Sequence, residues 1–116
     1  MNMEEFGLDE AKPLVMSDEA GVIVDINDEF PKLFLWNRDE LIGEPLLKII
    51  PPNLHDAHNL GFSRFISTEE PTLLDKPLKL AAVNKNGEQF VAMHLIRAKK
   101  HDGRWFFAAN IYITEE

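Results

Sequence analysis

The chain has 116 residues, a length that suits one compact domain. With 45% hydrophobic and 28% charged residues, its composition is that of an ordinary globular protein and excludes disordered, collagen-like and coiled-coil chains. Twelve basic residues against twenty acidic ones give a net charge of −8, which excludes nucleic acid and anionic lipid as expected partners. The absence of cysteine excludes disulfides, thiolate nucleophiles, zinc ribbons and photochemistry that traps a cysteinyl adduct of flavin.

The sequence carries no sign of a membrane segment or a secretion signal. Apolar runs such as 105–109 are far shorter than the roughly 18 residues that a membrane-spanning helix needs. The N-terminus is acidic, whereas a signal peptide begins with basic residues. We therefore expect a cytoplasmic protein with no membrane partner.

An arm and a hairpin are the first predicted elements. Residues 1–12 are acidic and weakly patterned, which predicts an N-terminal arm or cap, and a single domain is expected over 13–116. Two β-rich runs, 14–16 and 22–26, flank a turn that ends at Gly21 and are typical of a hairpin.

Helices are predicted in the middle of the chain. Asn27 or Asp28 can cap a first short helix, which Pro31 keeps short, and 37–43 has the capping residue, acidic first turn and final glycine of a second one. The longest helix is predicted over 54–67, after a proline pair that stops the preceding segment. Its predicted face comprises Leu54, His58, Gly61, Phe62 and Phe65.

Three strands are predicted in the last third of the chain. The hydrophobic period changes to two, and the runs 79–83, 90–97 and 105–114 are separated by turn segments at 84–87 and 99–103. Together with the first hairpin they predict a five-stranded antiparallel sheet. Short helices grouped on one side of such a sheet make an α+β fold.

Both faces of the strand predicted at 90–97 are apolar, although a sheet with one face in water alternates between apolar and polar residues. The outer face therefore needs a cover. Either the arm folds back over it through Phe6 and Leu8, or a second copy of the chain packs there as a homodimer, and the two possibilities are compatible. The residues predicted to form the outer row are Val91, Met93 and Leu95.

Three segments, taken in order, resemble a PAS sensory domain over 13–114. They are 18–27 (DEAGVIVDIN), 36–43 (WNRDELIG) and 86–90 (NGEQF), and their order and spacing are more specific than any one of them alone. The resemblance implies a PAS fold and a non-enzymatic sensory module. Such a module binds a small ligand or a partner domain and relays a conformational signal to a covalently or non-covalently linked output domain.

Within that family the long helix is most similar to the haem-binding PAS domains of bacterial oxygen sensors, the FixL and Dos type. That type carries a proximal histidine on this helix, and His58 falls on its position within 50–65. An arginine that holds a haem propionate corresponds to Arg64. The resemblance thus implies an alternative function, a haem b sensor of O2, CO or NO with His58 as the metal ligand.

The sequence also departs from that type. Leu78 stands where the type has an arginine that donates a hydrogen bond to bound oxygen, and Tyr112 replaces the aspartate of the signalling motif. His94 falls on an inward, distal-side position, where it can replace the missing donor or compete as a second ligand. Gly61, with no side chain to exclude a flat macrocycle, Phe62 and Ile96 complete the expected cofactor-binding set.

Plainer interpretations of the same residues stay open. His58 also suits a PAS domain without haem, Gly61 also relieves crowding under a sheet, and His94 also suits a core histidine bonded to the backbone. His55 and His58 form an i, i+3 pair, but no third zinc ligand accompanies them. A third class, a small isomerase-like α+β enzyme using His94 and a carboxylate, has no recognisable catalytic constellation, and we expect no enzymatic activity.

Overall fold

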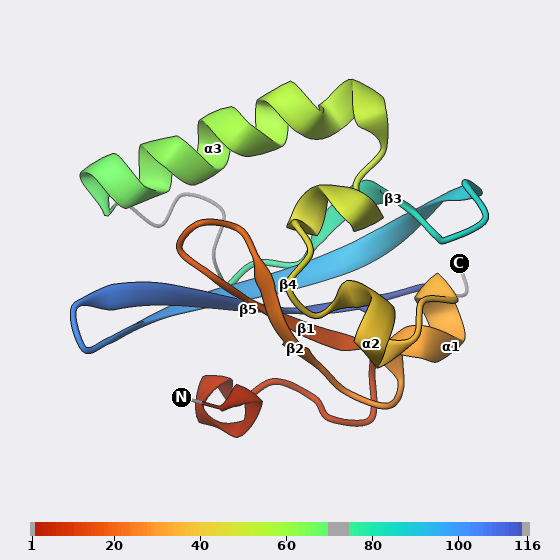
Figure 1. Ribbon diagram of the computed structural model, residues 1–116, viewed down its shortest axis with the longest axis horizontal. Helices are drawn as coiled ribbons and strands as arrows, with labels where there is room; N and C mark the ends of the chain where they lie inside the picture. Colours follow the sequence, from red (N-terminus) through yellow and green to blue (C-terminus); the bar gives the residue numbers. More distant parts are fainter. Residues whose placement is uncertain (1, 70–74, 115–116) are drawn as a thin grey trace.

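A five-stranded antiparallel sheet forms the centre of the computed structural model, which describes residues 2–69 and 75–114 (Figure 1). The strand order is β2-β1-β5-β4-β3. This sheet confirms the predicted α+β fold. Its strands are β1 (Leu14–Asp18), β2 (Ile23–Ile26), β3 (Leu78–Val83), β4 (Gln89–His101) and β5 (Arg104–Tyr112).

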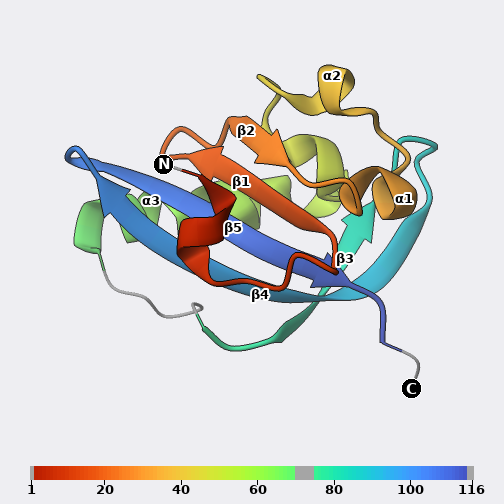
Figure 2. The same ribbon diagram turned by 90° about the horizontal axis from the view of Figure 1, so that it is seen from below.

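The helices lie on both sides of the sheet but are unequally divided. All except the first lie on one side, which we call the inner face, and the first lies on the opposite, outer face (Figures 1 and 2). Of the helices in the described residues, none is long and apolar enough to cross a membrane. They are η1 (Met3–Phe6), α1 (Phe30–Phe34), α2 (Arg38–Leu41), η2 (Leu46–Ile49), η3 (Pro52–Leu54) and α3 (His55–Thr68).

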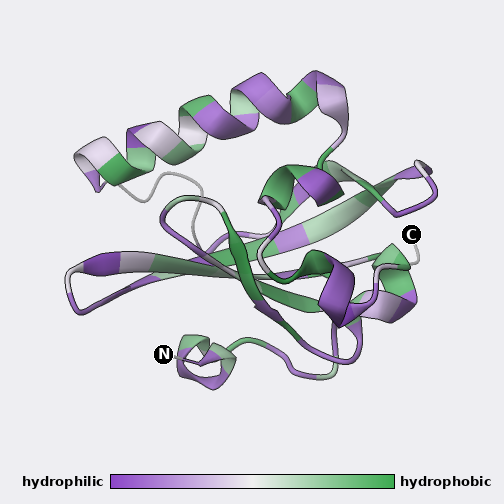
Figure 3. Cartoon of the chain, viewed as in Figure 1, coloured by the Kyte–Doolittle hydropathy of each residue, from purple (hydrophilic) through white to green (hydrophobic). Residues whose placement is uncertain are grey.

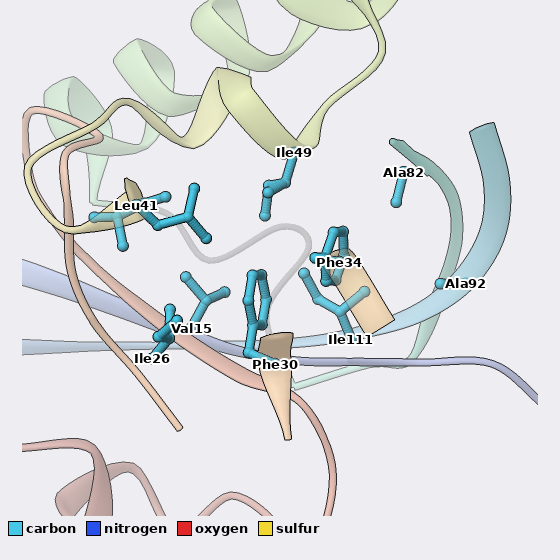
Figure 4. Packing of buried hydrophobic residues seen from close by; sticks show 10 residues of the cluster. Val15, Ile26, Phe30, Phe34, Leu41, Ile49, Ala82, Ala92 and Ile111 are labelled. Carbon is cyan, nitrogen blue, oxygen red and sulfur yellow. The ribbon is translucent and has the colours of Figure 1, made fainter. Parts of the chain in front are cut away.

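The main core lies between the inner face and the short helices. Phe30 and Phe34 of α1 stack with ring centroids 4.3 Å apart, and both are fully buried. They pack against Val15 of β1 and Ile111 of β5 (Figure 4). The predicted capping residue Asn27 accepts a hydrogen bond from the Phe30 amide, although Glu29 holds the N-cap position itself.

The β4–β5 hairpin is longer than the sequence predicts. The turn expected over 99–103 contracts to Asp102 and Gly103, because His101 already pairs with Arg104. Both turn residues have positive φ, 51° and 78°, as a two-residue Asp-Gly turn requires. Pairing therefore continues to the tip, and β4 extends beyond the predicted end at Arg97.

A second, smaller cluster lies on the outer face, where η1 covers β1 and β5. Phe6 is only 3% exposed and packs with Leu14, Met16 and Ala108. Leu8 adds to the same cluster. The expectation that the arm folds back over the sheet is thus confirmed for the half formed by β1 and β5.

Helix α3 lies above the inner face and is only loosely buried. It begins one residue after the predicted start and ends one residue after the predicted end, and hydrophobic and hydrophilic residues alternate along it (Figure 3). None of its residues is fully buried. Its aromatic contacts go to β5, where Phe62 lies 4.7 Å and Phe65 lies 5.2 Å from Phe107, measured between ring centroids.

Candidate functional site

A cleft with a volume of about 530 Å³ lies between α3, η2 and the turn that joins β1 to β2. We call it the α3 cleft. Small-molecule pockets in proteins commonly measure about 300 to 1,000 Å³, so the α3 cleft has room for a small organic ligand. The turn contributes Glu19, Ala20 and Gly21, and η2 with its preceding proline contributes Pro45, Leu46 and Leu47.

Helix α3 lines the cleft with two parallel rows of side chains. Residues four apart lie on the same face of a helix, so His58, Phe62 and Ile66 form one row. The neighbouring row is polar and consists of Asn59, Ser63 and Ser67. The cleft therefore offers an aromatic and aliphatic wall beside a strip of hydrogen-bonding groups.

His58 is the titratable group of α3 that faces the cleft. Burial lowers its pKa, and the nearby His55 lowers it further, so the ring is neutral at pH 7. Its ring centroid lies 5.6 Å from that of Phe62. A neutral imidazole offers one hydrogen-bond donor and one acceptor to a ligand.

His55 has a structural role at the start of α3. Its Nε2 lies 2.7 Å from the Ile50 carbonyl oxygen and 3.1 Å from that of Leu47. Because a carbonyl oxygen only accepts, Nε2 carries the proton and fixes the end of η2 to α3. His55 is thus occupied, and no group of three metal-ligating side chains occurs in residues 2–69 and 75–114.

His94 and Leu78 form a pair away from the α3 cleft. They face each other across β4 and β3, and neither lines the cleft. The Nδ1 atom of His94 donates to the Ala92 carbonyl oxygen at 3.1 Å, and burial lowers the pKa of the ring. Ile96 lies on the same face of the strand, opposite Ala109. The structure therefore places these three residues on β3 and β4, outside the lining of the α3 cleft.

Gly61 and Arg64 are exposed on α3 and do not line the cleft. Arg64 follows His58 by six residues, which is about 240° of net rotation around a helix. Its guanidinium is therefore directed away from the wall that carries His58. Among the described cleft residues, the Glu19 carboxylate is the only permanent charge.

The residues around the α3 cleft do not fit a haem group. His58 supplies a suitable imidazole, but no lysine or arginine that could pair with a haem propionate lines the described cleft. The cleft presents the carboxylate of Glu19 instead, and Arg64 lies outside it. The residue set expected from the resemblance to oxygen sensors is therefore not assembled around one site.

Ser17 is a buried polar side chain that the sequence analysis did not single out, and it does not line the α3 cleft. It is 1% exposed, and its hydroxyl has no hydrogen-bond partner among the described residues. It faces Phe107 across β1 and β5, just before the turn that lines the cleft. The alternation of side chains along the first strand could have predicted this burial. Leu14 and Met16 point outward, so Ser17 points inward.

The C-terminal end of α3 is fastened to the β4–β5 hairpin. The Glu69 carboxylate accepts hydrogen bonds from Trp105 Nε1 at 3.0 Å and from Lys100 Nζ at 3.3 Å. The Trp105 backbone amide donates to Glu19 at 3.1 Å, which joins the hairpin to the β1–β2 turn as well. The two walls of the cleft, α3 and the turn, thus share Trp105 as a support.

Comparisons with known proteins match this architecture. The family model described as the PAS fold matches residues 9–107. An uncharacterised protein from Azorhizobium caulinodans is 31% identical over 99 residues; the match covers 84% of this chain but only 14% of that protein. A PAS domain from Desulfitobacterium hafniense superposes with a TM-score of 0.72 at 16% identity, covering 89% of this chain and 92% of that one.

A PAS domain from a two-component sensor histidine kinase superposes with a TM-score of 0.70 at 13% identity, covering 89% of this chain and 85% of that one. At such identities the structural likeness shows the fold, and the match of the family model shows the family. The five-stranded sheet, the helices on its inner face and the matched residues lead to one conclusion. This chain belongs to the PAS family, whose members are sensory and signalling modules.

Proposed function

We propose that this chain is a sensory module that binds a small, uncharged organic molecule in the α3 cleft. The observation that carries the proposal is the pair of side-chain rows on α3, one apolar and one polar, along a cleft of about 530 Å³. Glu19 and the net charge of −8 disfavour an anionic ligand. Neutral His58 and the polar row favour a ligand that has an apolar body and one hydrogen-bonding group.

The proposed relay of the ligand signal rests on how α3 is attached to the rest of the domain. Its ends are fixed by His55 and Glu69, while its middle contacts the sheet through Phe62 and Phe65 on Phe107. A ligand between the middle of α3 and the β1–β2 turn would press on the Phe107 contact and so on β5. An output domain attached to this chain is the proposed receiver, and the likeness to a PAS domain of a histidine kinase supports that role.

A second copy of the chain is the other proposed partner. The half of the outer face formed by β3 and β4 lies beyond η1, and there Val91 is 56% exposed while Met93 and Leu95 are partly exposed. Apolar rows of this kind commonly mark interfaces. We propose that the chain forms a homodimer through this row.

We propose that this chain has no catalytic activity. His94, the residue of the isomerase alternative, is held to the backbone by Ala92. Within the described residues, no carboxylate pairs with it.

Ligand binding is tested by titrating neutral fragments into the 15N-labelled protein and following amide shifts. We expect shifts at α3 and at residues 19–21. Ile66→Trp fills the cleft and should weaken binding at least about tenfold, since the ligand then has no room. Leu60→Trp is the matched control, because Leu60 is 72% exposed on the same helix. Equal binding by both variants would exclude the α3 cleft as the site.

A further inference from the structure

One arginine on the outer face joins two segments that are far apart in the sequence. Arg97 lies on β4 opposite Ala108, a member of the outer cluster. Its Nη1 donates to the carbonyl oxygens of Phe6 and Gly7, each at 2.9 Å. Its Nε donates to Asp75 Oδ1 at 2.8 Å. The planar guanidinium therefore makes three directed hydrogen bonds to two separate segments.

The first segment is the N-terminal cap, which we define as residues 2–9. The cap lies against the outer face of the sheet (Figure 2), where Phe6 packs in the cluster with Leu14, Met16 and Ala108 and Asn110 bonds Asp9 at the end of the cap. Asn110 is 2% exposed; its Oδ1 accepts from the Asp9 amide and its Nδ2 donates to the Asp9 carbonyl, both at 2.9 Å. The docked cap thereby packs on β1 and β5 and reaches Arg97 on β4, while Val91, farther along β4, stays exposed.

The second segment leads into β3. Asp75 is the first residue described after α3 and Glu69, and its amide donates to the Ile96 carbonyl oxygen at 2.9 Å. Its φ of 62° puts it in the left-handed region, which is uncommon for a residue other than glycine. Its backbone amide bond to Ile96 and its carboxylate bond to Arg97 therefore fasten this residue to β4.

We propose that Arg97 is a latch that couples docking of the N-terminal cap to the position of Asp75. With Asp75 in place, the Nε bond orients the guanidinium so that both Nη1 hydrogens meet the cap carbonyls. When Asp75 is displaced, the side chain gains rotational freedom and both carbonyl contacts weaken. Coupling of this kind is reciprocal, so release of the cap also loosens Asp75.

The latch controls how much apolar surface the outer face exposes. If the cap leaves, Leu14, Met16 and Ala108 lose the cover of Phe6. These residues lie on the same face as Met93 and Leu95, so a partner would meet a wider apolar surface. The coupling is a property of the chain without any ligand and goes beyond the proposed function, whereas its use to carry a ligand signal rests on that function.

Hydrogen exchange of the ligand-free protein tests the latch. The readouts are the amides of Gly7, bonded to the Glu4 carbonyl, and of Asp9, bonded to Asn110. Arg97→Gln should raise exchange at both about tenfold, and Asp75→Ala should raise it several-fold, because local opening sets the exchange rate. Asp75→Asn, which keeps an acceptor, should restore part of the protection.

The double variant R97Q/D75A should exchange no faster than R97Q, since Asp75 acts through Arg97. The control is Glu29→Gln, which removes another exposed ion pair, with Lys32, and should leave the cap unchanged. Protection of the β4–β5 amides reports whether each variant is folded, and Arg97→Lys replaces R97Q if that variant unfolds. An unchanged cap in the folded arginine variant, or in D75A alone, would overturn the proposal, whatever the ligand titration shows.

Discussion

His58 and His94 are two partly buried imidazoles whose neutral form the fold favours. Burial is the main cause that lowers the pKa of each. Neither ring has a carboxylate partner among the described interactions. Protonation in the folded state is therefore opposed at both residues.

This predicts a pH dependence of stability. Because the folded pKa lies below the unfolded value of about 6.5, the unfolded chain takes up protons first as the pH falls. The free energy of unfolding should be at its full value above pH 7 and decline between pH 7 and pH 5. Urea unfolding at pH 5, 6 and 7 measures it.

His58→Gln and His94→Leu should each reduce that decline, whereas His101→Gln, at an exposed hairpin tip, is the control. The same decline in all three variants would mean that neither buried ring is responsible.

The positions of single residues also decide what we expect of haem binding. Since Arg64 lies away from the wall that carries His58 and Glu19 lines the cleft, we expect that haemin added to the purified protein develops no shifted Soret band. An absorption titration measures this. A shifted band that is lost in His58→Ala, but kept in His55→Ala, would show that the cleft rearranges to hold haem and would contradict the expectation.

At the scale of elements, α3 depends on one cluster of aromatic contacts with β5 of the sheet. Phe62 and Phe65 both meet Phe107, and Trp105 meets Phe65 at 4.9 Å between ring centroids. The rest of the helix is held chiefly at its ends. Phe107 is thus the residue of β5 that contacts both of these phenylalanine rings of α3.

We predict that Phe107→Ala destabilises the protein by about 3 to 5 kcal/mol, the usual cost of truncating a buried phenylalanine. Protection of α3 amides should fall more than that of α1, because α1 packs in the separate Phe30–Phe34 stack. Phe106→Ala is the matched control, because Phe106 is the adjacent residue and its ring points to the outer face. Urea unfolding and hydrogen exchange measure the two effects. Equal loss of protection in α1 and α3 would contradict a specific Phe107–α3 contact.

Local patterns predicted most elements but not all of their ends. Alternation and Gly-containing turns were sufficient for the strands, because they depend on neighbours in the chain. The end of β4 was misplaced because Lys99 and Lys100 look like turn residues, yet they pair with Phe106 and Trp105. The end of β4 is decided by the register of the hairpin, which the Asp-Gly turn sets.

At the scale of the molecule, the outer face is divided between the cap and an open apolar row. The cap buries the β1–β5 half, and the row of Val91, Met93 and Leu95 lies beyond it. That division places the proposed homodimer interface on β3 and β4.

We predict that Met93→Glu shifts the protein from dimer to monomer, because a carboxylate buried at an apolar interface loses its hydration. Light scattering at several protein concentrations measures the mass. Leu60→Glu, an equally polar change on exposed α3, should leave the mass unchanged. A wild-type protein that is already monomeric at high micromolar concentration would contradict the prediction.

The sequence by itself predicted the sheet and the helices of its inner face, because periodicity, capping residues and turns act over short distances, and the resemblance of three motifs indicated the family. Only the tertiary structure decided which residues meet. The rotation of α3 directs His58 into the cleft and Arg64 away from it, and cap docking brings Arg97 to Phe6, Gly7 and Asp75. These outcomes depend on packing between segments distant in the chain, which no local pattern encodes.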